Sequence, residues 1–397
     1  MKKLLLGTTA LVGFAASSAA LAGGSHYAAP AASGSAAAAG GLTVMIGGIV
    51  DSQAAFIDQD VEGAKTAAAG DEAGDMNFNT DVELHVTAAG STDSFDYGAV
   101  VELNTNVDGD PEGDDAGGDA DKTYIFVEGD DFGRFEFGSN EGASGTMEID
   151  ASNIARATGG IEGDWWHHVN TATVSNAAFE PNLVIADAIA TGADAAKLTY
   201  YTPRFSGLQL GVSYTPDSGD IGSALNLSAK DVVGEFENII AAGINYEADL
   251  DGVGLAVAAV IETGDSEEST AGTGTTVEDL EGYSIGAKLD FGGVAIAGNW
   301  ADRGDTGQAV GAAVDNTYWT LGAAVENGPY GLSVTYMDSE FGNAEHNNIV
   351  VGADYAMAPG FTPYVEAAFF EFDDGVAGTT AADNEGSVVL LGAELSF

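Results

Sequence analysis

Short segments in which apolar and polar residues alternate recur along the chain from residue 42 onward. In FNTDVELHV, which begins at Phe78, the apolar residues share one face, whereas Asp81, Glu83 and His85 share the other. Successive side chains of a β-strand point to opposite sides, so this alternation predicts strands whose two faces meet different surroundings. We predict sixteen strands, at about residues 42–57, 76–88, 95–107, 121–129, 133–139, 196–203, 207–215, 236–248, 254–263, 281–291, 293–301, 316–326, 330–338, 347–357, 361–373 and 386–397.

The connections between these strands alternate in length. Short turns such as 89–92 and 203–206 alternate with long, acidic, Gly-rich loops such as DGDPEGDDAGGDAD. Short turns at one end and long loops at the other are typical of an up-and-down barrel that crosses an outer membrane. The connection over about residues 140–195 is much longer than the rest. A loop of that length inside a compact domain is usually functional.

The polar strand faces distinguish a membrane barrel from a soluble sheet. In a dry core each unpaired carboxylate would cost several kcal/mol, whereas a water-filled lumen imposes little cost. The apolar faces must also leave water, and a closed barrel satisfies every backbone group, as lipid requires. In LQLGVSYT we therefore predict that Leu208, Leu210, Val212 and Tyr214 face lipid, while the residues between them face a channel. The alternative is the one-sided sheet of a soluble β-sandwich or periplasmic lectin.

The first 22 residues, MKKLLLGTTALVGFAASSAALA, have the pattern of a secretory signal peptide. Two lysines precede an apolar run, and Ala20-Leu21-Ala22 offers a small-residue cleavage site. A retained membrane anchor is the alternative, although the apolar run is short for a span of about 20 residues. Residues 23–41, rich in Ala, Gly and Ser, are interpreted as a flexible tether, and residues 42–397 as the barrel.

The chain is strongly acidic, with 11 Lys and Arg against 62 Asp and Glu. A phosphate backbone would repel such a chain, so nucleic acid is not expected as a partner. The absence of cysteine excludes disulfides and thiolate metal sites. The acidity fits either a lumen that concentrates cations or an adaptation to a saline habitat, and the sequence leaves both open.

Two motifs resemble those of Gram-negative general porins of the alphaproteobacterial type. YYTPRFSGLQLGVSYTPD, residues 200–217, is similar to their Y-x-P-x-F-x-G segment, and YIFVEGDDFGRFEFGSNEGA, residues 124–143, to the strand–turn–strand before their constriction loop. The resemblance implies a sixteen-stranded, homotrimeric barrel in the outer membrane of a Gram-negative bacterium. It also implies passive diffusion of ions and small hydrophilic solutes, and a third long loop that folds inward and narrows the bore.

The final residue, Phe397, ends an alternating strand. This ending resembles the C-terminal signature that the outer-membrane assembly machinery reads, so Phe397 is predicted to be an assembly signal.

Charged residues on the predicted lumen faces and in the long loop are the candidate pore-lining set. The wall members are Asp81, Glu83, Asp96, Glu102, Lys122, Glu128, Arg134, Glu136, Lys197, Lys288, Asp290 and Asp354, and the loop members are Glu141, Glu148, Asp150, Arg156, Glu162 and Asp164. Many porins of the resembled type set a row of arginines across from the acids of the loop, whereas this wall has eight acids and only four bases. A net negative pore predicts a preference for cations.

No motif indicates catalysis. The five histidines include His167 and His168 beside Trp165 and Trp166, but none accompanies a nucleophile, so an enzyme is not expected. One acidic loop approximates a calcium-binding loop, through Asp108, Asp110, Glu112 and Asp119 at positions 1, 3, 5 and 12. It has no flanking helices, and Pro111 occupies position 4, so a solvated acidic loop is the preferred interpretation. An acidic, calcium-binding surface or structural β protein is therefore the second functional hypothesis, and no other cofactor is predicted.

Overall fold

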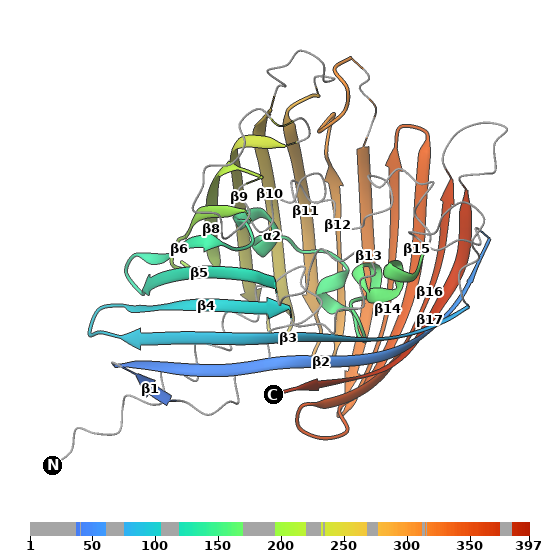
Figure 1. Cartoon of the computed structure of the whole chain (residues 1–397), viewed down its shortest axis with the longest axis horizontal. Helices are drawn as coiled ribbons and strands as arrows, with labels where there is room; N and C mark the ends of the chain where they lie inside the picture. Colours follow the sequence, from blue (N-terminus) through green and yellow to red (C-terminus); the bar gives the residue numbers. More distant parts are fainter. Residues whose placement is uncertain are drawn as a thin grey trace.

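The computed structural model describes residues 37–39, 41–60, 75–104, 119–169, 195–219, 232, 235–267, 277–311, 314, 316–373 and 383–397. Sixteen of its strands, β2 to β17, each pair antiparallel with their neighbours in the sequence, and β17 pairs with β2 (Figure 1). The sheet is therefore a closed barrel with no free edge, which confirms the predicted fold class.

The strands of the barrel are β2 (Leu42–Gln59), β3 (Met76–Ser91), β4 (Asp96–Asn104), β5 (Asp119–Gly129), β6 (Gly133–Ser139), β7 (Ala196–Tyr201), β8 (Leu208–Asp217), β9 (Phe236–Asp249), β10 (Gly254–Ser266), β11 (Leu280–Asp290), β12 (Val294–Asp302), β13 (Asn316–Asn327), β14 (Tyr330–Phe341), β15 (Ala344–Tyr355), β16 (Phe361–Asp373) and β17 (Asn384–Ser396). A short strand, β1 (Ala37–Ala39), pairs with the start of β2. The predicted signal peptide, residues 1–22, lies outside the described residues.

Each of the sixteen predicted strands has a counterpart, and the main difference lies between β14 and β15. The prediction left residues 339–346 as a loop, but the two strands continue to a two-residue turn at Gly342 and Asn343. Ser339 and His346 are buried and Glu340 is exposed, so the alternation runs on through the predicted loop. Gly342 has a φ of 65°, a conformation that glycine adopts readily, and this allows the tight turn.

The two faces of the barrel have the predicted chemistry. Leu208, Leu210 and Val212 on β8 are exposed on the outside, whereas Ser213 and Thr215 are buried on the inside. Many other large apolar side chains are exposed on the outer surface, as a barrel solvated by lipid requires. Among the described residues, no helix is long and apolar enough to cross a membrane.

The seam that closes the barrel includes the last residue of the chain. The backbone N–H of Phe397 donates to the carbonyl oxygen of Gly48 on β2, and the N–H of Gly48 donates back to the carbonyl oxygen of Phe397, both at 3.0 Å. Phe397 therefore extends the β17–β2 ladder by one residue pair at the point where the two ends of the sheet meet.

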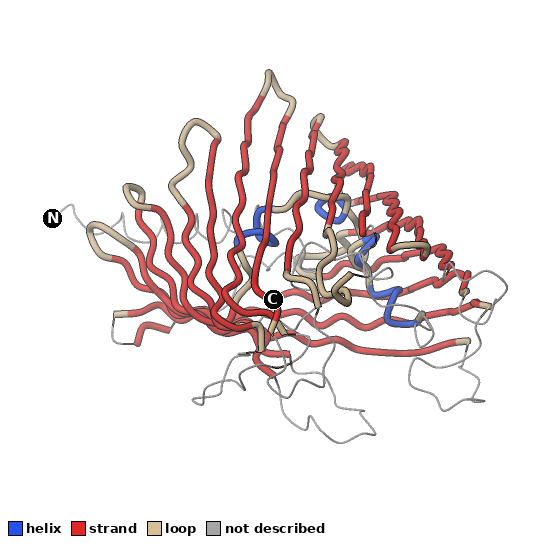
Figure 2. The backbone as a smooth tube through the Cα atoms, turned by 90° about the horizontal axis from the view of Figure 1, so that it is seen from above, coloured by secondary structure: helices blue, strands red, loops and turns tan. Residues whose placement is uncertain are grey.

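Short helices lie within the curve of the strands (Figure 2). They are α2 (Ala143–Met147) and the 3-10 helices η1 (Ser152–Ile154), η2 (Gly160–Glu162) and η3 (Asp164–His168). All four belong to residues 140–169, the described part of the long connection between β6 and β7, which we call the constriction segment. The prediction that the longest loop folds inward is confirmed for its described part, residues 140–169.

Candidate channel constriction

The constriction segment follows the inner wall over much of the barrel. α2 packs against β7 to β10, η1 against β12 and β13, η2 against β14 and β15, and η3 against β17 and β2. The strands β3 to β6 complete the circle and form the arc of wall that faces the segment. The channel is therefore bounded by the constriction segment on one side and by the β3–β6 arc on the other.

Hydroxyl groups of the wall accept hydrogen bonds from the backbone of the segment. The N–H of Ala143 donates to Ser213 Oγ on β8 (2.7 Å), and the N–H of Ala151 donates to Thr320 Oγ1 on β13 (3.0 Å). A third bond, of 2.9 Å, runs from the N–H of Arg156 to the hydroxyl of Ser333 on β14. A segment that forms no strand must satisfy its buried N–H groups elsewhere, and the wall supplies these acceptors.

Two further links involve carboxylates. Glu366 on β16 is fully buried and accepts from the Thr158 hydroxyl (2.6 Å) and from the Thr158 N–H (3.2 Å). On the segment itself, Asp164 accepts from Gln53 Nε2 of β2 at 2.5 Å. Burial raises the pKa of Asp164 to about 7, because an ionised carboxylate loses most of its hydration there.

Three other acids of the segment, Glu148, Asp150 and Glu162, turn toward the wall rather than into open water. Asp150 and Glu162 are 6% and 3% exposed, and Glu148 accepts a bond of 2.8 Å from Asn299 Nδ2 on β12. Burial, reinforced by the neighbouring Asp150, raises the pKa of both Glu148 and Glu162 well above the ordinary carboxyl value. Burial also raises the pKa of Asp150. These carboxyl groups favour the neutral form more than exposed ones do.

Apolar packing holds the end of the segment. Trp165 is fully buried, donates from Nε1 to the carbonyl oxygen of Gly160 (2.8 Å), and stacks on Phe370 of β16 with ring centroids 5.9 Å apart. The neighbouring Trp166 stacks on His167 at 3.9 Å. Trp165 thus packs the end of the segment against the wall.

The β3–β6 arc has a ladder of paired charges. Its cations are each held by carboxylates: Lys122 lies 3.3 Å from Glu102, and Arg134 lies 2.8 Å from Glu128 and 2.5 Å from Glu136. The guanidinium of Arg134 also lies 4.3 Å from the centroid of the Phe126 ring.

A histidine continues the ladder on β3. His85 Nε2 lies 3.0 Å from a carboxylate oxygen of Glu83. Apart from the buried Glu136, the charged side chains of the arc that the structure describes are partly exposed, unlike Asp150 and Glu162 on the segment.

The remaining predicted cations lie beside the segment. Lys197 is buried and donates to the carbonyl oxygen of Asn140, and Lys288 Nζ lies 3.5 Å from the carbonyl oxygen of Asn153. Arg156 pairs with Glu326 at 2.6 Å and lies 3.9 Å from Asp354. Apart from Asp290, the exposed last residue of β11, the predicted pore-lining residues thus fall into two groups, one on the arc and one in or against the segment.

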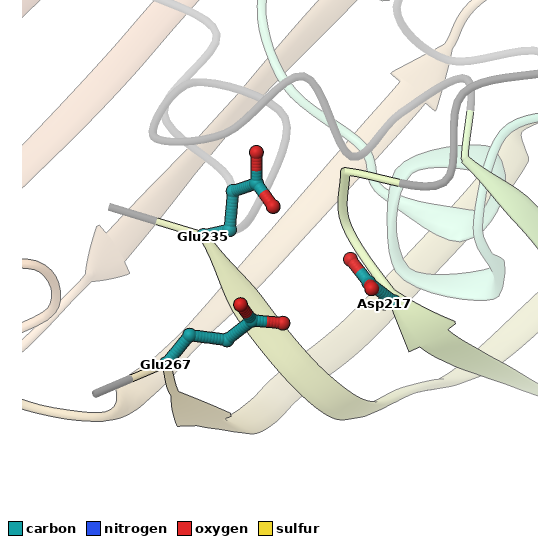
Figure 3. A group of neighbouring side chains, drawn as sticks. All are labelled: Asp217, Glu235 and Glu267. Carbon is teal, nitrogen blue, oxygen red and sulfur yellow. The ribbon is translucent and has the colours of Figure 1, made fainter. Parts of the chain in front are cut away.

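A separate carboxylate cluster lies where β8, β9 and β10 end in loops (Figure 3). Oxygens of Asp217, Glu235 and Glu267 lie within 4.8 Å of one another, and burial together with the other two carboxylates raises the pKa of Glu235. Acidic side chains often gather in this way without an ion, so the cluster alone does not indicate a metal site. The calcium candidate with Asp108, Asp110 and Glu112 lies outside the described residues, as does the side chain of its fourth member, Asp119.

Comparison with known proteins agrees with this geometry. A family model described as Gram-negative porin matches residues 7–375. The chain belongs to the Gram-negative porin family. This porin is 23% identical over 385 residues to an uncharacterised protein of Rickettsia typhi, covering 81% of the chain and 85% of the relative. An uncharacterised protein of Rickettsia bellii is 24% identical over 335 residues, covering 69% and 76%.

Solved structures with the same fold include an anion-selective porin from Comamonas acidovorans, with a TM-score of 0.61 and 18% identity over 90% of this chain and 100% of that one. A mutant of the Rh. blastica porin has a TM-score of 0.55 and 15% identity, covering 89% and 100%. A loop-deletion mutant of OmpT, an outer membrane protein of Vibrio cholerae, has a TM-score of 0.58 and 13% identity, covering 90% and 100%. The porin is therefore an outer-membrane protein, and its family and fold are those of channels rather than enzymes.

Several residues that hold the constriction segment of the porin were not singled out in the sequence. Gln53, Ser213, Thr320, Ser333 and Glu366 are ordinary polar members of alternating strands. Their lumen-facing positions were predictable, but which of them meet the segment depends on its path across the wall. The alternation of polar and apolar residues along the strands does not predict that path.

Proposed function

We propose that this porin forms a water-filled channel for the passive diffusion of ions and small hydrophilic solutes, with a preference for cations. The closed barrel supplies a wall that satisfies its own backbone groups in lipid. The constriction segment supplies the bore, and the charges of the β3–β6 arc supply the selectivity. This function requires no cofactor.

The charge balance of the β3–β6 arc is the observation that supports cation preference. Among the described residues, six carboxylates face the lumen from these strands, against two permanent cations and one histidine. Both permanent cations, Lys122 and Arg134, are already paired with carboxylates of the same arc. An anion therefore meets few unneutralised positive charges, while a cation meets an excess of negative ones.

The fold by itself does not set the sign of the selectivity. The porin from Comamonas acidovorans is anion-selective and has the same fold at 18% identity. Selectivity must therefore arise from the side chains that line the bore.

The reversal potential of purified porin in a planar bilayer tests the proposal. Across a KCl gradient at low salt, we expect the sign of a potassium-preferring channel, with a preference that weakens toward 1 M, where the Debye length falls to about 3 Å. A chloride-preferring sign at low salt would show that the basic residues dominate the neck. Deleting residues 145–160 should raise the conductance, because the deletion removes the part of the segment that contains η1.

We also propose that the porin is a homotrimer, as the resemblance to general porins implies. Gel electrophoresis in detergent tests this, because an assembled barrel trimer migrates differently before and after boiling. Identical migration in both lanes would contradict the trimer, and it would leave the selectivity measurement as the test of the channel itself.

A further inference from the structure

The constriction segment approaches the wall most closely at glycines. Six lumen-facing glycines lie beside it on six different strands: Gly211 on β8, Gly243 on β9, Gly286 on β11, Gly322 on β13, Gly331 on β14 and Gly352 on β15. The segment therefore meets a glycine at successive points along its path around the wall.

The clearance at each glycine shows how closely the segment approaches. A methyl group at Gly286 would lie 1.7 Å from the carbonyl oxygen of Ile149, and one at Gly352 would lie 2.4 Å from the carbonyl oxygen of Arg156. Contacts of a Cβ below 3.0 Å are essentially never observed, so the segment would have to move.

The other four glycines are more tolerant. At Gly211 and Gly243 the nearest atom of the segment is the flexible Met147 Sδ, at 2.5 and 2.9 Å. At Gly322 it is the Ala151 Cβ at 3.2 Å, and at Gly331 it is the Cδ of the flexible Arg156 side chain at 2.9 Å. Gly286 and Gly352 are thus the two points where backbone of the segment touches the wall with no flexible side chain between them.

Hydroxyl groups accompany these glycines on the same strand faces. Ser213 lies two residues from Gly211 and accepts from the N–H of Ala143, and Thr320 lies two residues from Gly322 and accepts from the N–H of Ala151. The glycine leaves room for the backbone of the segment, and the neighbouring hydroxyl accepts a hydrogen bond from that backbone. Residues two apart on a strand face the same side, so a single strand can supply both features.

We infer that these lumen-facing glycines, with Gly286 and Gly352 as the decisive pair, are positioning residues that seat the constriction segment against the wall and so set the bore. The inference rests on the channel function proposed above. A side chain at either position would push the segment toward the β3–β6 arc, because the barrel wall behind the glycine is held by the hydrogen bonds of its strands. The passage between segment and arc would then become narrower.

Single-channel recording of Gly286→Ala, Gly352→Ala and a control provides the test. The control is Gly254→Ala on β10, a lumen-facing glycine whose added methyl would meet only Asp290, at 3.3 Å. We expect the two test variants to lose conductance and to show new sub-conductance steps, while the control conducts as the unchanged porin does. If both test variants conduct as well as the control, the inference is wrong. The proposed channel function is tested separately, by whether the unchanged porin conducts.

A second comparison covers the case in which Gly286→Ala fails to assemble. The same substitution is placed in the porin that lacks residues 145–160, which removes Ile149 and its carbonyl oxygen. If Gly286 acts through the segment, the substitution has no effect on assembly or conductance in this background, as a double-mutant cycle requires. If Gly286→Ala impairs assembly equally in both backgrounds, the glycine serves the strand itself and the inference is wrong.

Discussion

Arg134 is the residue at which the proposed selectivity is most sensitive to a single change. Its guanidinium lies between Glu128 and Glu136 on the arc that faces the constriction segment, at 2.8 and 2.5 Å. Its side chain is 20% exposed, so its positive charge acts on ions that pass through the channel. Arg134→Gln removes one positive charge and leaves two carboxylates without their cation. We expect the preference for potassium over chloride to increase.

The size of the effect follows from Coulomb's law. One unit charge acting on an ion about 5 Å away in water is worth about 0.8 kcal/mol, and screening at 0.1 M salt leaves roughly 0.5 kcal/mol. That energy enriches the cation about 2.3-fold and depletes the anion by about the same factor, so the permeability ratio of cation to anion changes by about fivefold. At 1 M, where the Debye length is about 3 Å, the same charge should change the ratio by less than about twofold.

Reversal potentials at the two salt concentrations measure this change. Arg204→Gln is the matched control, since Arg204 pairs with Glu247 at 3.1 Å but lies in the short turn between β7 and β8, outside the charge ladder of the arc. Heat-dependent gel migration establishes that both variants form barrels. A ratio that stays constant in assembled Arg134→Gln, or that moves toward chloride, would refute the placement of Arg134 at the selective part of the channel.

Three further predictions concern assembly and the seating of the segment. The pKa of Asp164 is raised to about 7, so its contribution to seating is full below about pH 4 and is lost as the pH rises through 7; Asp164→Asn should weaken this dependence in hydrogen exchange of residues 156–169, where Glu162 also has a raised pKa. Thr158→Val leaves buried Glu366 without its hydroxyl donor and should destabilise the barrel by about 1–3 kcal/mol in urea unfolding, whereas Thr158→Ser should retain most of the stability. Deleting Phe397 removes two backbone hydrogen bonds of the seam, and we expect a lower yield of barrel in the outer membrane with unchanged conductance of the barrels that form; a normal yield under strong expression would contradict its role in assembly.

The sequence alone determined the architecture of this porin. Alternation with period two predicted all sixteen strands and the orientation of their faces, because a half-wet, half-lipid surface demands that pattern in every strand. The length of the connection over residues 140–195 indicated a functional loop, and the resemblance to general porins implied that it folds inward. Charge counting along the inner faces indicated an acidic lumen, and the described strands place Glu83, Glu102 and Arg134 on it.

The site was only partly predictable, because charge at a lumen-facing position does not say what the charge meets. Glu162 in the long loop and Arg134 on the wall were both predicted to line the pore, yet Glu162 is 3% exposed against the wall and Arg134 is held in the partly open ladder of the arc. Only the path of the segment separates them.

The tertiary structure also decided which small residues matter. Gly286 and Gly352 are two of 56 glycines and have no distinguishing neighbours in the sequence. Their importance comes from the carbonyl oxygens of Ile149 and Arg156, which lie more than 130 residues away in the chain. The alternation of polar and apolar residues along a strand indicates whether each face meets lipid or water. Close contact between two backbones depends instead on how distant parts of the chain pack together, which the local sequence does not encode.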